Sequence, residues 1–430
     1  MRVLLTGATG LIGSAVLARL RDAGHEIVAV SRSAAAARRL PEGTTCVALD
    51  IGTAVRPADW LAHLAGIEAV VSCAGVLQDS PRDSTAGVHI EGASALFAAC
   101  EQAGVRRIVH LSAVGVDRDA STAFARSKYA GDERLMASRL DWVILRPSVV
   151  VGRAAYGGSA LFRGLAALPV IPRVAGSGPL QVVQLDDVVR TVLFFLDPKA
   201  PARVALEIAG PERLPLDQIL STYRCWLGRD RARFVSVPGW LAGAMFRLGD
   251  MLGLLGWRPP LRTTVRCELA RGAVGDPAEW MRLTGIEPRS LAVALAGEPA
   301  SVQERWFARL YFLKPVALSV LSLFWIVTGL IALGPGWRAA AAIMQEAGAA
   351  GAAALLVAAG AVADIGIGAA IAVQRTARRA LQLALAVACA YAVLGAILLP
   401  RLLSDPLGAL LKIMPIVVLH VIALAILDDR

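Results

Sequence analysis

Three glycines at a spacing of three residues follow the first apolar run of the chain, and this pattern can bind phosphate groups. Residues 3–5 are apolar, Gly7, Gly10 and Gly13 come next, and an amphipathic stretch follows. The first glycine suits a tight turn, the second lets a phosphate approach the backbone, and the third lets a helix pack on the strand. Since a helix N-terminus attracts anions, this strand–turn–helix pattern predicts a dinucleotide-binding site.

The expected contacts of the dinucleotide extend from this loop to the ends of the next strands. We expect the pyrophosphate to contact a set of loop residues, which are Gly7, Thr9, Gly10, Leu11, Ile12 and Gly13. The second expected strand leads into Ser31 and Arg32, where NAD-selective sites carry an acidic residue. A hydroxyl and a guanidinium suit a 2′-phosphate, so the sequence favours NADP(H), with NAD(H) as the alternative. Asp50 ends the third expected strand, where it can meet the adenine.

Alternating strands and helices are needed to bring these residues together. The further expected strands are short and apolar, and they comprise residues 46–50, 69–73, 108–111 and 142–145. Strands that alternate with helices of this size predict an α/β fold, a doubly wound parallel sheet of the Rossmann type. Ligands bind at the carboxyl ends of such strands. Ala74, Gly75 and Ser112 follow two of these strands, and we expect them to line the same crevice.

These landmarks resemble those of a known superfamily. The chain resembles the short-chain dehydrogenases/reductases, in their extended and atypical branches, at Thr6-Gly7-x-x-Gly10-x-x-Gly13, Ala74-Gly75, Ser112 and Ser127-Lys128. The run 124–133 is similar to the atypical group that includes the Rossmann-fold accessory subunit of respiratory complex I. This resemblance covers about residues 1–300 and implies a nucleotide-binding domain with a small C-terminal lobe.

The chain departs from this superfamily at the catalytic pair. The resemblance implies a tyrosine and a lysine four residues apart on one helix, which transfer a proton and bind the nicotinamide ribose. Lys128 is present, whereas Phe124 occupies the tyrosine position and has no proton to give. Loss of such an acid costs on the order of 10²–10⁴ in rate. Ser112 matches the active-site serine, and Tyr156, in a later glycine-rich loop, is an alternative hydroxyl.

The apolar residues are concentrated in the C-terminal part of the chain. The 430 residues are 56% hydrophobic, with a mean hydropathy of +0.59. We divide the chain into a nucleotide-binding domain at 1–300, a juxtamembrane helix at 301–314 and a membrane domain at 315–430. Segments of membrane-spanning length predict a four-helix transmembrane bundle, and they comprise residues 315–334, 349–373, 380–399 and 407–427.

The membrane domain resembles the DoxX-like family at residues 322–325, 363–368 and 405–408. Some relatives of that family are linked to quinone-coupled oxidation, which implies a quinone-type substrate. Three polar residues, Asp364, Lys412 and His420, interrupt the spans, and such residues usually face the bundle interior. We expect Asp364 to pair with His420 or Lys412, either to hold the bundle together or to form a proton or quinone site.

Basic residues assign an orientation to the spans. They cluster before the first span and between the second and third, at Arg305, Arg309, Lys314, Arg375, Arg378 and Arg379. The positive-inside rule then places both termini in the cytoplasm of a bacterial inner membrane. We assign the net charge of +10 to contact with membrane lipid rather than with nucleic acid, because no nucleic-acid motif accompanies it. We expect no secretory signal, because no apolar segment with a cleavage site opens the sequence.

Two functions are compatible with these patterns. The first is a membrane-anchored, NADP(H)-binding oxidoreductase that acts on a lipophilic or quinone-type substrate at the inner membrane surface. A hydride can pass to a flavin or quinone without a proton from a side chain. The alternative is a non-catalytic nucleotide-binding subunit or assembly factor of a respiratory-type membrane complex, which would bind partner proteins of that complex. Phe124 favours the alternative.

Two further features of the sequence, the cysteines and one apolar run, do not decide the function. Six cysteines lack the spacing of a metal site or a disulfide framework, so we expect free thiols and no metal ion. The apolar run 240–255 is interrupted by Arg247 and Asp250. We favour a helix of the C-terminal lobe packed on the sheet, with a helix on the membrane surface as the alternative.

Overall fold

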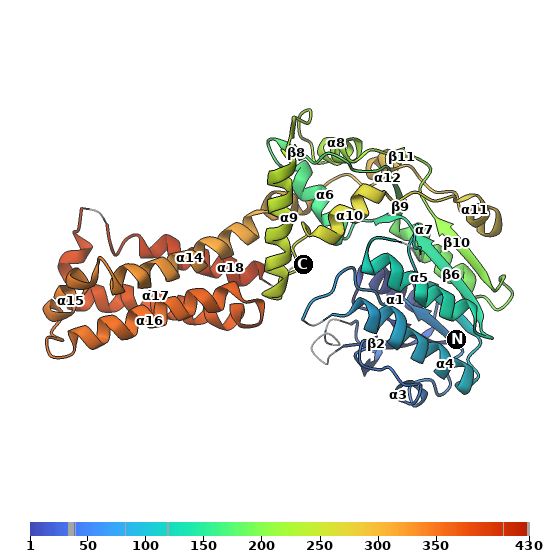
Figure 1. Ribbon diagram of the computed structural model, residues 1–430, viewed down its shortest axis with the longest axis horizontal. Coiled ribbons are helices and arrows are strands. Elements are labelled where there is room, and N and C mark those ends of the chain that lie inside the picture. The colour runs from blue at the N-terminus through green and yellow to red at the C-terminus, as the bar shows by residue number, and fades with distance from the viewer. Residues whose placement is uncertain (33–37, 39, 82, 118–119, 407, 428–430) are drawn as a thin grey trace. The chain divides into compact units, whose positions relative to one another are not determined.

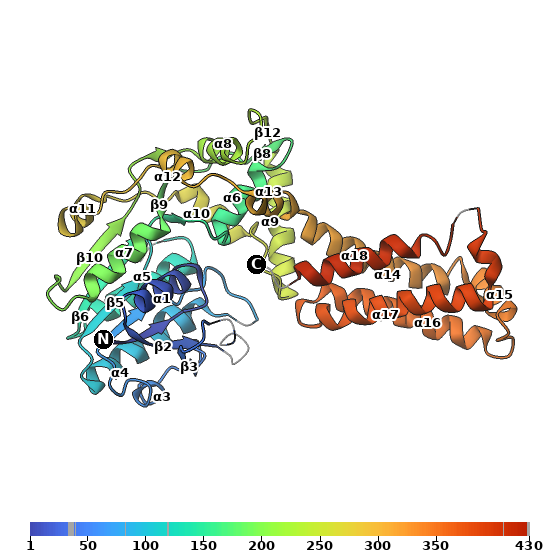
Figure 2. The ribbon, with the colours of Figure 1, turned by 180° about the vertical axis from the view of Figure 1, so that it is seen from behind.

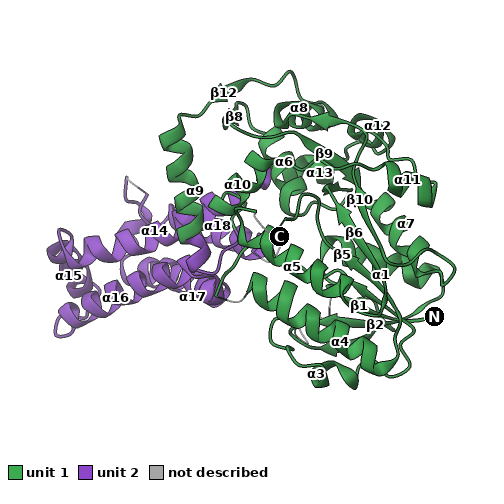
Figure 3. Cartoon of the chain, turned by 45° about the vertical axis from the view of Figure 1, so that its right-hand side comes forward, with its two compact units in different colours: residues 1–251, 259–308 green, residues 252–258, 309–430 purple. Residues whose placement is uncertain are grey.

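The computed structural model describes residues 1–427, apart from residues 33–37, 39, 82, 118–119 and 407. The chain forms two compact units (Figure 3). The first contains residues 1–251 and 259–308, and the second contains residues 252–258 and 309–430. The first unit carries every residue that the sequence assigns to the nucleotide.

A seven-stranded parallel sheet forms the centre of the first unit (Figure 1). In spatial order its strands are β10 (Val204–Ile208), β6 (Asp141–Pro147), β5 (Arg107–Leu111), β4 (Ala69–Ser72), β1 (Arg2–Thr6), β2 (Glu26–Ser31) and β3 (Thr45–Ala48). Strand β1 lies between β2 and β4, and Val3 is in register with Ile27 on one side and Ala69 on the other. The strand order therefore reverses beside β1, which is where open α/β sheets bind ligands.

Helices cover both faces of this sheet. Helices α1 (Leu11–Asp22), α7 (Leu185–Leu196) and α11 (Ala278–Thr284) share a core with one face, and α3 (Ala58–Leu61), α4 (Ala93–Ala103) and α5 (Ala123–Met136) share a core with the other. Alternate residues of β1 serve the two cores, with Val3 and Leu5 in the first and Leu4 in the second. The predicted doubly wound Rossmann fold is confirmed.

A smaller lobe follows the sheet and contains two short sheets and several helices (Figure 2). Its strands are β7 (Val149–Val151), β8 (Ile171–Arg173), β9 (Leu180–Gln184), β11 (Arg213–Leu214) and β12 (Phe234–Ser236). Its helices are α6 (Gly157–Ala166), α8 (Leu216–Trp226), α9 (Gly239–Leu254), α10 (Thr263–Arg271), α12 (Leu291–Gly297) and α13 (Val302–Leu310). The lobe has its own core, in which Phe162, Ile219 and Tyr223 are buried.

The second unit is helical and apolar. It contains α14 (Leu313–Leu333), α15 (Trp337–Glu346), α16 (Ala353–Ala372), α17 (Gln374–Leu398), the short 3-10 turn η2 (Pro400–Leu403) and α18 (Ile413–Ile426). Helices α14 and α16 pack closely because glycines lie between them. A Cβ on Gly329 would lie 2.5 Å from the Ala361 carbonyl oxygen, and one on Gly368 would lie 2.6 Å from the Ser322 carbonyl oxygen. Small residues commonly allow such close packing of membrane helices.

Three of these helices are long and apolar enough to cross a membrane, namely α14, α16 and α17. The fourth expected span forms α18, which has 14 residues and is shorter than the 407–427 segment that the sequence indicated. Residues 409–412 form turns instead, and Gly408 before them has a positive φ of 65°. The helical domain with apolar helices is confirmed, whereas Leu407, part of the DoxX-like motif, lies outside the described residues.

Candidate functional site

The glycine loop has the geometry of a phosphate-binding turn. Gly7 follows β1 with a φ of +69°, and a Cβ there would lie 2.8 Å from the backbone nitrogen of Ala74. A Cβ on Gly13 would lie 2.1 Å from the Gly7 carbonyl oxygen, so only glycine lets α1 start this close to the strand. Sequence spacing alone therefore identified two positions that the packing requires to be glycine.

The N-terminus of α1 is open to an anion. Gly10 is its N-cap and provides no side-chain hydrogen bond to the first turn. A Cβ on Gly10 would meet only the Gly7 carbonyl oxygen, at 3.3 Å, so this side of the loop is not filled by protein. Thr9 is exposed in the turn, and Leu11 and Ile12 begin the helix half-buried. The first-turn N–H groups lack a capping side chain, and these are the groups that the sequence predicts to bind the pyrophosphate.

The residues expected at the adenosine end have partners within the protein. Ser31 is buried at the end of β2, and the half-exposed Arg32 forms an ion pair with the buried carboxylate of Asp83. Asp50 accepts a hydrogen bond from the backbone N–H of Gly52 at 3.0 Å, which stabilises its own turn. Sequence reasoning missed Asp83, because it lies 51 residues from Arg32 in the chain.

Lys128 lies beneath the turn that follows β4. The backbone N–H of Ala74 donates to Thr6 Oγ1 at 3.3 Å, and a Cβ on Gly75 would lie 3.4 Å from Lys128 Nζ. The buried Lys128 ammonium donates to the Leu111 carbonyl at 2.7 Å. Burial lowers the pKa of Lys128 to about 8, although the carboxylate of Asp132 opposes this shift. The glycine loop, the Ala74-Gly75 turn and Lys128 therefore lie next to one another.

A hydrogen-bonded chain links His89 to the helix that carries Phe124. The N–H of Val76 donates to His89 Nε2 at 3.0 Å, so the ring carries its proton on Nδ1, which lies 2.9 Å from Ser127 Oγ. Ser127 in turn donates to the Phe124 carbonyl at 3.0 Å. Burial lowers the pKa of His89 to about 2, with a smaller effect from Lys128. The neutral imidazole thus fixes the start of α5 and has no hydrogen-bonding atom left for a substrate.

Ser112 belongs to a buried polar network. Its hydroxyl donates to Asp132 Oδ2 at 2.9 Å, and Arg146 donates to the same oxygen at 3.0 Å. Asp132 is fully buried, and this burial raises the pKa of its carboxyl, whereas the neighbouring Arg146 opposes the shift. His110 Nε2 lies 3.7 Å from the other carboxylate oxygen. The sequence analysis missed Asp132, Arg146 and His110, which only the fold brings beneath Ser112.

These side chains can hold a nucleotide but offer no acid at the expected catalytic position. Lys128 is the cationic group beneath the crevice, and Phe124 lies one helical turn before it on α5. Tyr156, the alternative hydroxyl, is the N-cap of α6 in the lobe. Among the described residues, no group of three or more His, Cys, Asp or Glu side chains could hold a metal ion. The chemistry that this arrangement supports is hydride transfer without a side-chain proton donor at position 124.

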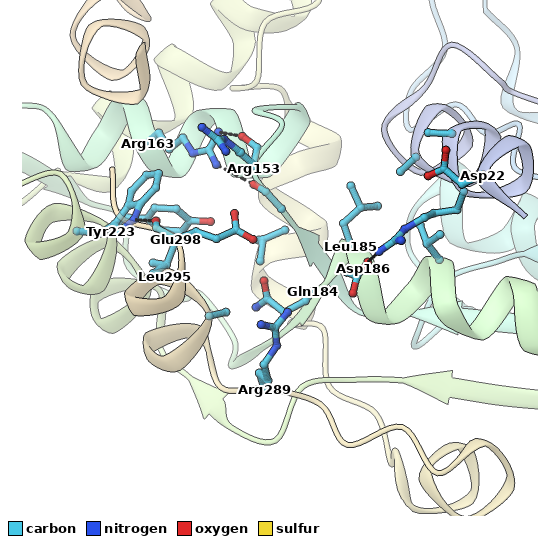
Figure 4. Close-up of a pocket in the computed structure, with 18 residues that line it drawn as sticks. Asp22, Arg153, Arg163, Gln184, Leu185, Asp186, Tyr223, Arg289, Leu295 and Glu298 are labelled. Atoms are coloured by element: carbon cyan, nitrogen blue, oxygen red, sulfur yellow. Dashed lines mark hydrogen bonds and ion pairs between the residues drawn. The ribbon is translucent and has the colours of Figure 1, made fainter. Parts of the chain in front are cut away.

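A separate cavity of about 320 Å³ lies away from these residues (Figure 4). It is lined by α1, the start of α7 and the lobe, and Arg163 and Gln184 are among its labelled residues. Arg163 donates to the carbonyls of Gly152 and Arg153 at 2.7 Å and 3.0 Å, so its guanidinium supports the backbone around the cavity. None of the residues assigned to the nucleotide lines it.

The expected pairing of polar residues in the membrane unit is wrong. Asp364, on α16, accepts a hydrogen bond of 3.4 Å from the Tyr391 hydroxyl of α17. His420, on α18, accepts one of 3.0 Å from Trp325 Nε1 of α14. Among the described interactions neither His420 nor Lys412 pairs with Asp364, because α16 turns Asp364 towards α17 while α18 turns His420 towards α14.

Comparison with known proteins assigns both parts of the chain. Residues 7–163 match a family described as NAD(P)H-binding, and residues 322–421 match the DoxX-like family. Over 306 residues the chain is 30% identical to the 3-diazoavenalumate denitrifying reductase of a Streptomyces species, which covers 65% of this chain and 93% of that enzyme. It is 28% identical over 221 residues to an uncharacterized protein of Mycobacterium tuberculosis, which covers 51% of this chain and 23% of that protein. The chain thus spans about a quarter of the length of this mycobacterial relative.

Solved structures share the fold of the first unit. The Bordetella bronchiseptica enzyme WbmG, in complex with NAD, is similar with a TM-score of 0.56 and 17% sequence identity. The match covers 72% of this chain and 96% of that enzyme. At this level of identity the likeness concerns the fold alone.

Proposed function

Because this chain belongs to the NAD(P)-binding short-chain dehydrogenase/reductase superfamily and ends in a DoxX-like membrane domain, we propose that it is a membrane-anchored oxidoreductase that uses NADP(H). Its substrate is a lipophilic molecule or a quinone, which it meets at the inner surface of a bacterial plasma membrane. NADP(H) supplies or accepts a hydride when it is bound. The residues of this chain bind it, orient it and leave the proton to the substrate or to water.

Within the oxidoreductase proposal, Phe124 decides the kind of acceptor, although the same residue also favours the non-catalytic alternative. It lies one turn before Lys128 on α5, and its ring packs on a neutral His89. No group at this position can protonate the oxygen of a ketone as it is reduced. A quinone differs, because the hydroquinone anion that hydride transfer produces is far less basic than the alkoxide formed from a ketone, and it can form before water protonates it. The Streptomyces relative is named as a reductase of a diazo compound.

Arg32 supports the choice of NADP(H). Its side chain is half-exposed at the end of β2, next to Ser31, and a guanidinium has five N–H donors, of which Asp83 takes only part. A 2′-phosphate can accept hydrogen bonds from the others. Asp83 also offers an acidic group near this place, which is the feature that would favour the ribose hydroxyls of NAD(H) instead.

The distribution of basic residues supports a cytoplasmic nucleotide-binding unit. Arg375, Arg378 and Arg379 lie in the first turns of α17, directly after α16, whereas Arg338 and Arg401 are the main basic residues of the other loops. The positive-inside rule then assigns the α16–α17 junction to the cytoplasm. NADP(H) is available on that side of the membrane.

Calorimetric titration of the detergent-solubilised protein with NADPH and NADH tests the cofactor. We expect NADPH to bind more tightly, and Arg32→Ala to weaken NADPH by about tenfold while leaving NADH nearly unchanged, because a charged hydrogen bond contributes about 1.5–3 kcal/mol. Tighter binding of NADH would contradict the assignment of NADP(H). Turnover is then measured with a water-soluble quinone and with small ketones, and we expect reduction of the quinone only.

A non-catalytic nucleotide-binding subunit of a membrane complex is the second candidate. The arrangement of Lys128 and Ser112 favours it, because the Lys128 ammonium already donates to Leu111 and the Ser112 hydroxyl already donates to Asp132. Under this candidate the protein binds NADPH without turnover of any acceptor and copurifies with other membrane subunits.

A further inference from the structure

Helix α9 presents an apolar face that is exposed in the described structure. Trp240, Leu248, Met251 and Leu254 are 77%, 57%, 63% and 75% exposed. Their positions, at spacings of eight, three and three residues, place them on one side of the helix. Arg247 is the charged residue on this side. An exposed patch of large apolar residues of this kind marks a surface that meets a partner or a membrane.

The opposite face of α9 is firmly packed, so the exposed face does not result from a loosely held helix. Phe246 is buried, and the Arg266 guanidinium of α10 lies 5.9 Å from its ring centroid. A Cβ on Gly249 would lie 1.6 Å from the Leu261 carbonyl oxygen, which shows how closely the backbones approach. Asp250 also forms an ion pair of 3.2 Å with Arg262. The sequence-based preference for a packed lobe helix thus describes one face of α9 only.

The chain that continues from α9 is part of the membrane unit. Residues 252–258 belong to the second unit, where Trp257 Nε1 donates to the Ala372 carbonyl at 2.6 Å and the Gln374 N–H donates to the Leu255 carbonyl at 3.1 Å. These contacts lie at the junction of α16 and α17, beside the basic cluster of α17. The C-terminal end of α9 is therefore tied to the end of a membrane span.

The second chain segment that connects the two units also carries exposed apolar side chains. Helix α13 leads directly towards α14, and its exposed side carries Val302, Trp306 and Leu310 together with Arg305 and Arg309. Tryptophan and arginine on an apolar helix face are typical of the membrane–water interface. Both chain segments that enter the membrane unit thus carry an exposed tryptophan among aliphatic side chains.

We propose that the exposed face of α9, together with that of α13, lies in the headgroup region of the cytoplasmic leaflet. The occupant of this face is the lipid bilayer and not a protein. Residues 255–257, which follow α9 directly and form hydrogen bonds with the α16–α17 junction, keep the helix within reach of the bilayer surface. Arg247 is opposite in charge to anionic headgroups. This inference goes beyond the proposed activity and does not depend on which nucleotide or acceptor is used.

Fluorescence quenching by labelled lipids tests the proposal on the full-length protein. Leu248→Cys is labelled with the fluorophore NBD in a parent whose exposed Cys225 and Cys389 are changed to Ser. The protein is reconstituted in vesicles of phosphatidylcholine and phosphatidylglycerol that carry a nitroxide either near the headgroup or at the end of the acyl chain. The matched control carries the label at Glu212→Cys, an exposed position of the lobe just before β11.

We expect the label at position 248 to be quenched about threefold more strongly than the label at position 212, and the shallow nitroxide to quench it better than the deep one, because interfacial helices lie about 5–10 Å into the headgroup boundary. Equal quenching at the two positions would overturn the proposal, and so would stronger quenching by the deep nitroxide. A shielded label together with a doubled particle mass would identify a second copy of the chain as the occupant, which also overturns it.

Leu254→Cys, on the same face, provides a second label site if Leu248→Cys does not fold. Calorimetric titration of each labelled protein with nucleotide serves as the folding control. Position 248 is not among the residues assigned to the nucleotide. Quenching therefore reports a loss of lipid contact, and calorimetry independently reports a loss of nucleotide binding.

Discussion

Phe124 packs edge to face against His89, with the two ring centroids 5.8 Å apart. The imidazole is neutral at physiological pH, because burial lowers its pKa to about 2, and both of its nitrogens are hydrogen-bonded within the protein. The pair therefore provides no proton at the position where the resemblance to the superfamily implies a tyrosine hydroxyl. Hydride transfer and proton transfer are separated in the function that we propose.

A substitution that places a hydroxyl at position 124 tests whether hydride transfer occurs here without a side-chain proton donor. We expect Phe124→Tyr to raise the NADPH-dependent reduction of small ketones by about 10²–10⁴-fold, because a positioned general acid contributes this factor. The measurement is the rate of NADPH oxidation with each ketone. Phe124→Leu is the control, since it removes the ring without adding a donor. The same low ketone reduction in the parent and in Phe124→Tyr would show that no carbonyl substrate reaches this helix.

Two substitutions in the glycine loop distinguish an effect on folding from an effect on nucleotide binding. A Cβ on Gly13 would lie 2.1 Å from the Gly7 carbonyl oxygen, so we expect Gly13→Ala to lower the apparent Tm by several degrees and to abolish nucleotide binding. A Cβ on Gly10 would meet only one backbone oxygen, at 3.3 Å. We expect Gly10→Ala to keep its Tm within about 2 °C and still to weaken nucleotide binding at least tenfold. Unchanged affinity in a folded Gly10→Ala protein would place the nucleotide elsewhere.

Ser112 and Asp132 are expected to act on stability rather than on turnover. We expect Asp132→Ala to destabilise the protein by about 1–3 kcal/mol, because it leaves the partly buried Arg146 and the Ser112 hydroxyl without their acceptor. Ser112→Ala removes one hydrogen bond and costs about 0.5–1.5 kcal/mol. Thermal unfolding and quinone reduction are measured for both variants, with Ser112→Thr as the conservative control. A large loss of turnover in a Ser112→Ala protein of nearly normal Tm would instead make Ser112 a catalytic residue.

Local patterns explain what the sequence could predict. Gly7 and Gly13 are constrained by contacts within a few residues, and the apolar periods that mark strands and spans are also local. The order of the elements and the apolar helices therefore followed from the sequence. The short α18 and the extra helix α15 were not predicted, because the length of an apolar segment does not show where turns such as the one at Gly408 interrupt it.

The missed residues all depend on contacts between distant parts of the chain. Asp83 reaches Arg32 across 51 residues, and Asp132 reaches Ser112 across 20. Nothing near either acid in the sequence marks its partner. Asp364 was recognised as a polar residue of a span, but its partner was not, because the choice between Tyr391 and His420 depends on how the helices are rotated. The packing between elements therefore determines which side chains become partners, and the spacing of residues within one element does not predict these partners.

The buried Lys128 is expected to give the protein a specific pH dependence. Its pKa is about 8 in the folded protein, below the 10.5 of an exposed lysine. Between these values the unfolded chain binds a proton that the folded chain has released, so the stability of the fold rises with pH in this window. We expect the parent to gain about 2–3 kcal/mol relative to Lys128→Met between pH 8 and pH 10.

Thermal unfolding of both proteins across this pH range provides the measurement. Other titrating groups are shared by the two proteins and cancel in the difference. A difference in stability that stays constant between pH 8 and pH 10 would mean that Lys128 keeps its ordinary pKa, and hence that it is more hydrated than its contact with Leu111 indicates.

The contact between Asp364 and Tyr391 tests whether the membrane unit takes part in the reaction. If Asp364 transfers protons for the quinone that NADPH reduces, we expect Asp364→Asn to lower quinone turnover at least tenfold and to leave the affinity for NADPH unchanged, because the variant removes a proton-accepting group within a span. Tyr391→Phe is the matched variant, since it removes only the hydroxyl that donates to Asp364 at 3.4 Å. Leu383→Ala, an exposed position of α17, controls for a general effect on the span. Normal turnover in both the Asp364 and Tyr391 variants would restrict the membrane unit to anchoring the oxidoreductase.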